Sequence, residues 1–196
     1  MPNSKEQSAP SATAARRATG AMFFSVFGGA WLMLWAYRSF GATPWPSLAI
    51  GAVTIALFLF CRRRYAQNKG ALLLEQDGPA QARVGRIFNI INAAQWIGIL
   101  VVNNVLINIG LADWVVPAAI LIIGLHFLPL AKLFSNPPHY ITGVALIALS
   151  LVYPRLAPQG PLDAIGCLMA GLILWASALW AVRAGQTNAR SLIQET

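Results

Sequence analysis

Long segments that are almost free of charged residues constrain this chain more than any other feature of its sequence. Residues 21–37, AMFFSVFGGAWLMLWAY, contain no charged side chain. The hydrocarbon core of a bilayer is about 30 Å thick, so a helix needs about 20 apolar residues to cross it. Six segments approach that length, and the fifth is short. We predict one spanning helix for each, at about 20–38, 45–61, 88–110, 113–134, 139–153 and 161–183.

The composition supports this interpretation. Hydrophobic residues make up 57% of the chain and charged residues only 10%, with a mean hydropathy of +0.61, whereas a soluble domain has about 25% charged residues. Such a chain cannot cover a water-facing surface with polar groups. We therefore predict an all-α fold, a polytopic membrane helix bundle with six transmembrane helices.

The domain organisation follows from the same pattern. Residues 1–19 are rich in Ser, Ala, Pro and Thr and lack an apolar period, which predicts a disordered tail. Residues 20–184 form the predicted transmembrane domain, which includes a basic loop at 62–86. A short tail at 185–196 follows it.

The distribution of basic residues predicts the orientation. When Lys and Arg are assigned to alternate sides of the six spans, 12 fall on the side of the two termini and 2, Arg38 and Arg155, on the other. Cytoplasmic loops carry an excess of Lys and Arg. Both termini are therefore predicted to be cytoplasmic, in a multi-pass protein of the cell inner membrane.

The net charge of +8 does not indicate a nucleic acid partner, because the basic residues flank apolar runs instead of forming a stripe interleaved with aromatics. The basic loop favours contact with anionic lipid headgroups, and docking of a cytoplasmic partner is the alternative. Lys132 is expected to extend its side chain to the same interface. The predicted interfacial contacts are Arg62, Arg63, Arg64, Lys69 and Lys132.

The third predicted span, FNIINAAQWIGILVVNNVLINIG, is unusually rich in side-chain amides. At about 100° per residue, four of them fall within a sector about 120° wide. Amides facing lipid would leave donors and acceptors unpaired, so this amide stripe is expected to face other helices or water. It consists of Asn89, Asn92, Gln95 and Asn103.

His126, in the segment GLHFLPLAKLF, is the second polar group predicted within the membrane. Because a four-residue connection makes the third and fourth spans an antiparallel hairpin, His126 lies level with Gln95 and Asn92, and we predict a hydrogen bond to one of them, directly or through water. Pro129 leaves the carbonyl of the residue four positions earlier free and is expected to kink the helix. Gly124 is expected to let a neighbouring helix approach closely.

A structural role for these residues is the alternative. Polar residues between membrane helices often act as packing contacts, at about 0.6 kcal/mol each. His126 could be such a contact, although an imidazole titrates near neutrality. His139 is expected at the interface, and the alternative is that it shares a site with His126.

No catalytic constellation is recognised in the sequence. A phosphate-binding glycine loop, a nucleophile elbow, an HExxH motif and paired carboxylates are all missing. We therefore predict no catalytic residue, no metal, no cofactor and no enzymatic activity. Cys61 and Cys167 fall in different apolar segments, so a disulfide between them is not expected.

The segments GLHFLPLAKLF and NPPHYITG resemble stretches in an uncharacterised family of small bacterial inner-membrane proteins with about six helices. That resemblance implies a bacterial inner-membrane setting, and no activity or site residue comes with it.

Three functions remain open at this point. The first is a small-molecule or ion transporter, or a subunit of one, with the polar site on its pathway. The second is a non-catalytic accessory or sensory membrane protein. The third is a membrane enzyme acting on lipid or quinone with His126 as base, which lacks a partner acid. The small size of one chain favours a homo-oligomer or a membrane-protein partner in the case of transport.

Overall fold

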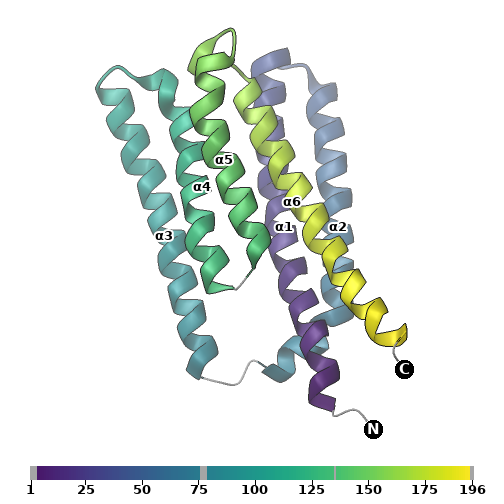
Figure 1. Ribbon diagram of the computed structural model, residues 1–196. Helices are drawn as coiled ribbons and strands as arrows, with labels where there is room; N and C mark the ends of the chain where they lie inside the picture. The colour runs from purple at the N-terminus through teal and green to yellow at the C-terminus, as the bar shows by residue number, and fades with distance from the viewer. Residues whose placement is uncertain (1–3, 76–78, 135, 195–196) are drawn as a thin grey trace.

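The computed structural model describes residues 4–75, 79–134 and 136–194, and the regular secondary structure of this part of the chain is all helical (Figure 1). The side chains described are those of residues 12–70, 82–134, 136 and 138–183. The six long helices are α1 (Ser4–Phe40), α2 (Pro44–Glu75), α3 (Pro79–Asn108), α4 (Val115–Leu133), α5 (Pro137–Leu156) and α6 (Ile165–Gln194). Two short 3-10 turns, η1 (Ala112–Trp114) and η2 (Gly160–Leu162), precede α4 and α6.

Each of the six helices contains a stretch long and apolar enough to cross a membrane, which indicates an integral membrane protein. The predicted all-α class with six long apolar helices is confirmed in the described residues. The fifth helix is longer than predicted, because its apolar stretch begins at Pro138 and continues to Leu156, giving 19 residues.

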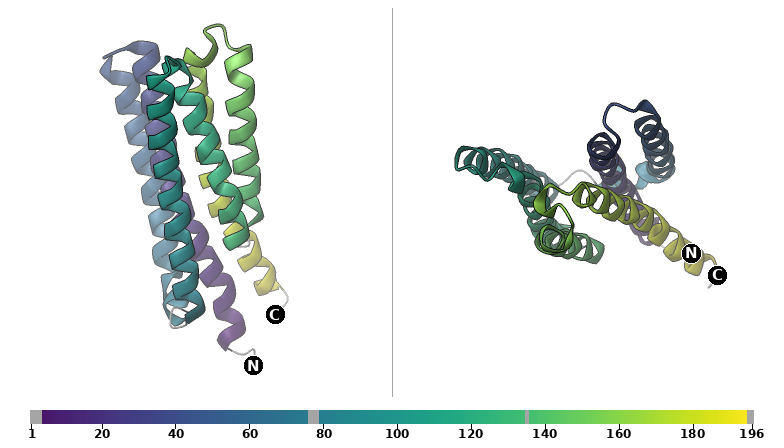
Figure 2. Two further views of the ribbon diagram at one scale, coloured as in Figure 1. Left: turned by 90° about the vertical axis from the view of Figure 1, so that its left-hand side faces the viewer. Right: turned by 90° about the horizontal axis from the view of Figure 1, so that it is seen from above.

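The helices form an open array instead of a closed ring. Figure 2, seen from above, shows α3 and α4 at one end and α1 and α2 at the other, with α6 between them. The packed neighbours follow the order α2, α1, α6, α5, α4, α3. Helices α2 and α3 are therefore the outer helices. No described residue of α3 is buried, and Cys61 is the single buried residue among the described side chains of α2.

The core lies among α1, α4, α5 and α6. Its buried apolar residues include Phe24, Ile120, Phe127, Leu146 and Leu174. Close approach of α4 and α5 depends on Gly124, as the sequence predicts, because a Cβ at this position would lie 2.9 Å from the carbonyl oxygen of Gly143. Small residues allow membrane helices to pack this closely.

Two segments differ from the sequence prediction. Helix α1 already begins at Ser4, and Ala12, Ala15 and Ala18 are buried, so the disorder predicted for 1–19 is wrong for the described part of that segment. Alanine has the highest helix propensity, and its small side chain packs without an apolar period.

The basic loop predicted at 62–86 is also wrong as a loop. Helix α2 continues to Glu75, and α3 begins at Pro79, where a proline is tolerated in the first turn. Residues 76–78, between the two helices, lie outside the described residues. Helix α6 likewise continues through most of the predicted tail, to Gln194.

The sixth helix begins later than predicted. Pro161 lies in η2, and the backbone of Asp163 is extended. The Asp163 carboxylate accepts a hydrogen bond from the backbone N–H of Ile165 at 2.9 Å, which satisfies one of the free donors of a helix start. This contact sets the beginning of α6 at Ile165.

Candidate intramembrane polar site

The amide stripe of α3 divides into two parts in the structure. Asn92, Gln95 and Asn103 are half-buried, and α4 is the main neighbour of α3. We call these three the central amides. Asn89 is exposed instead. The central amides are therefore half-buried beside another helix, as expected, and contact of Asn89 with water stays a prediction.

The central amides have no hydrogen-bond partner that the structure describes. Among the described residues, no hydrogen bond joins a side chain to Asn92 or Gln95, and Oδ1 of Asn103 is buried without a partner. By contrast, Asn108 donates to the Oδ1 of Asn104 at 2.7 Å, one turn away and near the end of α3. The unpaired amides are thus the ones deep within the helix.

His126 points from α4 towards α3. Its imidazole lies against the backbone of Ile91, next in the chain to Asn92, and its Nδ1 is buried without a hydrogen-bond partner. The predicted juxtaposition of His126 with α3 is present at about the predicted depth. The predicted direct hydrogen bond to Gln95 or Asn92 is wrong in the described residues, and a water-mediated one stays a prediction.

A second histidine joins His126, which the sequence presented only as the alternative. The imidazoles of His126 and His139 both pack against the ring of Phe127, with centroids at 5.6 and 6.0 Å. Phe24 of α1 closes the cluster at 5.3 Å from Phe127 and 5.5 Å from His139. His139 is half-buried, so the cluster joins helices α1, α4 and α5.

Two further polar groups were not singled out from the sequence. Asn136 precedes α5, its amide nitrogen lies 3.3 Å from Nε2 of His139, and its Oδ1 is buried without a partner. The hydroxyls of Thr142 and Ser177 share a hydrogen bond of 2.8 Å between α5 and α6. Single hydroxyls and a lone Asn in an apolar pattern gave no signal for these contacts.

The remaining predicted site residues lie on α4 and α2, and most of them are exposed. Pro129 is exposed inside α4, which continues as a helix to Leu133, and Lys132 is exposed in its last turn. Arg62, Arg63 and Lys69 are exposed on α2. The guanidinium of Arg64 instead lies over the ring of Phe60, 5.5 Å from its centroid.

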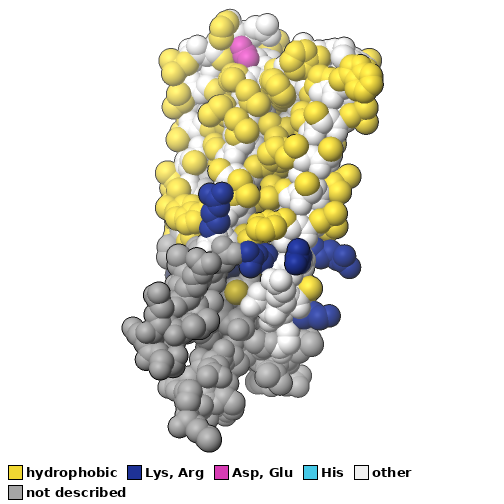
Figure 3. Space-filling view, turned by 90° about the vertical axis from the view of Figure 1, so that its right-hand side faces the viewer, with side chains coloured by type: hydrophobic (Ala, Val, Ile, Leu, Met, Phe, Trp, Pro, Cys, Tyr) yellow, Lys and Arg dark blue, Asp and Glu magenta, His cyan; other side chains and the backbone are white. Residues whose placement is uncertain are grey.

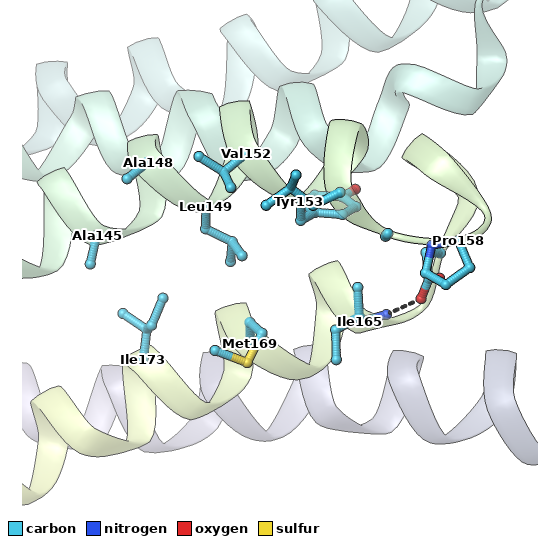
Figure 4. A pocket seen from close by; sticks show the side chains of 12 residues that line it. Ala145, Ala148, Leu149, Val152, Tyr153, Pro158, Ile165, Met169 and Ile173 are labelled. Carbon is cyan, nitrogen blue, oxygen red and sulfur yellow. Dashed lines mark hydrogen bonds between the residues drawn. The ribbon is translucent and has the colours of Figure 1, made fainter.

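A groove between α5 and α6 does not involve the polar groups. It has a volume of about 660 Å³ and lies between α5 and α6, near their connection. Figure 4 shows Ala145, Leu149 and Val152 of α5 facing Met169 and Ile173 of α6 across it. The lining is almost entirely apolar, so this groove offers no polar path to His126.

Chemically, the polar site offers unpaired amide groups and imidazoles in an apolar surrounding. The described residues contain no group of three or more His, Cys, Asp or Glu side chains that could hold a metal ion. Comparison of the chain with family models, curated proteins and solved structures gives no match. The functional argument therefore depends on the site alone.

Proposed function

We propose that this protein is a membrane transporter for a small molecule or ion, or a subunit of one, with the central amides and His126 on its pathway. One observation carries this proposal. Asn103 and His126 each hold a buried polar atom without a partner, on facing helices within apolar stretches. Each unpaired polar group in hydrocarbon costs several kcal/mol, so water or a solute has to meet them.

A pathway at this site requires more than one chain. Among the described side chains, α3 has no buried residue and α2 has one. His126 lines neither the groove between α5 and α6 nor a second groove on α2. A second copy or another membrane protein against α3 would enclose the central amides. We therefore propose a homo-oligomer or a hetero-oligomer as the transporting unit.

The proposed orientation places both termini in the cytoplasm of a cell with an inner membrane. Figure 3 shows basic side chains gathered in a band below a broad hydrophobic surface. Arg38 and Arg155 lie at the ends of α1 and α5, at the opposite end of the array from the basic residues of α2. This separation supports the positive-inside assignment. The resemblance to small bacterial membrane proteins stays a prediction.

A non-catalytic accessory or sensory protein is the second candidate. The observation that favours it is that the groove between α5 and α6 and the groove on α2 are lined by neither His126 nor His139. In that case His126 and His139 are packing contacts around Phe127, and α3 is a surface for a partner helix.

Water access at position 126 separates the two candidates. The background variant is Cys61→Ser with Cys167→Ser, because both cysteines are free. His126→Cys is then added, and vesicles of known sidedness are treated with a membrane-impermeant thiol reagent. Labelling of the thiol at position 126 from either face supports a pathway, and protection from both faces in a folded protein supports the accessory function.

Matched positions make the result specific. The control is Leu125→Cys, since Leu125 is next in the chain and half exposed, at 49%, but its side chain is on a different side of α4. A pathway through the polar site predicts that the thiol at position 126 is labelled and the thiol at position 125 is not. Equal labelling of both would indicate a loosened protein and would count against the proposal.

A further inference from the structure

A second groove lies on the surface of α2 and has a basic lining. It has a volume of about 400 Å³, and the described residues that line it are Leu59, Arg62, Arg63, Tyr65, Ala66 and Lys69. Arg62, Ala66 and Lys69 are spaced four and three residues apart, which places them on one helix face. No carboxylate is among these lining residues. Like charges on one face repel each other, so an anion is the ligand that this arrangement fits.

The groove changes character along its length. Leu59 belongs to the apolar run that ends at Cys61, and Arg62 is the first charged residue after that run. From Leu59 to Lys69 the helix rises by about 15 Å. The groove thus begins in the apolar stretch and extends past the first basic residues, and Tyr65 supplies an aromatic ring and a hydroxyl of the kind found at membrane interfaces.

The neighbouring arginine shows that position, and not basic charge alone, defines the groove. Arg64 does not line it and lies over Phe60 instead. Three consecutive arginines therefore divide into two that line the groove and one that does not. This division was not visible in the sequence, which grouped all three as equivalent contacts.

We propose that this groove is a binding site for an anionic phospholipid. The lipid phosphate lies between Arg62 and Arg63, where two guanidinium groups can donate to its oxygens. An acyl chain runs along Leu59, and the headgroup extends towards Lys69. A free phosphate offers the same oxygens but leaves the apolar end of the groove empty, and this favours a lipid. The inference does not depend on transport by the protein.

Native mass spectrometry of the purified full chain tests this site. The apparent Kd is measured for dioleoyl phosphatidylglycerol and for dioleoyl phosphatidylcholine, in the wild type and in two double variants. Arg62→Gln with Arg63→Gln removes two charges from the groove. Arg83→Gln with Arg86→Gln removes two exposed charges from α3 and is the matched control.

We expect the groove variant to lose at least about tenfold in affinity for phosphatidylglycerol, since each basic residue near an anionic surface contributes about fivefold. The control should change by less than about threefold, because diffuse attraction at a distance is screened. Phosphatidylcholine should bind more weakly than phosphatidylglycerol in the wild type, because its choline offsets the charge of the phosphate, and it should lose less affinity than phosphatidylglycerol in the groove variant. Arg62→Lys with Arg63→Lys keeps both charges and should retain most of the binding.

Three results would overturn the proposal. Equal losses in the two double variants would mean diffuse attraction without a site. Equal affinity of the wild type for the two lipids would remove the anion requirement. Displacement of phosphatidylglycerol by millimolar inorganic phosphate would identify a soluble phosphate as the ligand instead of a lipid. If a double variant does not fold, single variants repeat the test: Arg63→Gln changes the groove, and Arg64→Gln is its control outside the groove.

Discussion

The two outer helices, α2 and α3, occupy similar positions in the array but differ in whether their polar side chains find hydrogen-bond partners. Each packs mainly against one neighbour. In α2 the hydroxyl of Thr54 donates to the backbone carbonyl of Ile50 at 2.7 Å, so this polar group is satisfied within its own helix. In α3 the central amides find no such partner among the described residues.

The difference follows from the chemistry of the side chains. A threonine hydroxyl is short enough to reach the carbonyl one turn earlier, and a helix that carries it can face lipid. An amide has two donors and an acceptor with two lone pairs, and one backbone carbonyl cannot meet them all. Helix α2 is therefore suited to lipid, and α3 to water or another chain.

The attachment of the two helices should give the largest contrast. Helix α1 approaches α2 so closely that a Cβ at Gly29 would clash with Oγ1 of Thr54, whereas a Cβ at Gly98 of α3 would lie 3.6 Å from Cγ2 of Ile122, an ordinary contact. Gly29→Ala should lower the free energy of unfolding by about 1–3 kcal/mol through overpacking. Gly98→Ala should leave it unchanged or raise it by up to about 1 kcal/mol.

Reversible unfolding in mixed detergent micelles measures both changes. If Gly98→Ala destabilised the protein as much as Gly29→Ala, α3 would be packed as tightly as α2. The contrast in attachment would then be lost.

A weaker contact joins α3 to α1. The rings of Trp96 and Phe27 lie 6.4 Å apart, and both side chains are partly exposed. Trp96→Leu should cost about 0.5–1.5 kcal/mol, the range of an aromatic pair. Trp45→Leu on α2 is the control, because Trp45 is 75% exposed, and it should cost less than about 0.5 kcal/mol. Equal costs in the same unfolding assay would mean that the contact between Trp96 and Phe27 adds nothing to stability.

The smallest change in stability is expected at the central amides themselves. Asn103→Leu removes an amide without a hydrogen bond in the described structure, so the free energy of unfolding should stay within about 1 kcal/mol of the wild type. When Asn103→Leu is combined with His126→Cys, labelling at position 126 should fall several-fold if water enters along these amides. A loss of stability above about 2 kcal/mol would instead identify Asn103 as a packing contact.

The sequence predicted the six helices because twenty-residue apolar runs have one structural solution in lipid. It located the ends less well, since Ala, Arg and Lys continue a helix into water as readily as they form a tail. Thus 62–75 belongs to α2 and was predicted as a loop. The start of α6 depends on the hydrogen bond from the backbone N–H of Ile165 to the Asp163 carboxylate. This bond can be identified only from the backbone geometry.

The polar site was predictable in part. Periodicity placed Asn92, Gln95 and Asn103 on one stripe, and the short connection placed His126 opposite them. The contact of both His126 and His139 with Phe127 depends on how α5 packs against α4. Hydrophobic periodicity carries no information about that packing. The separation of Arg64 from Arg62 and Arg63 needed side-chain contacts for the same reason.

The central claim is that the central amides of α3 meet water while α2 meets lipid, and spin labels at Gln95 and Ile55 test it most directly. The start of α2 and the end of α3 lie at the same end of the array (Figure 1). Counted from there, Ile55 and Gln95 lie at about the same depth. The measurement is the ratio of collision rates with a water-soluble nickel chelate and with oxygen, in the protein reconstituted into vesicles. The account predicts a ratio several-fold higher at position 95 than at position 55. Equal ratios at both positions would contradict it.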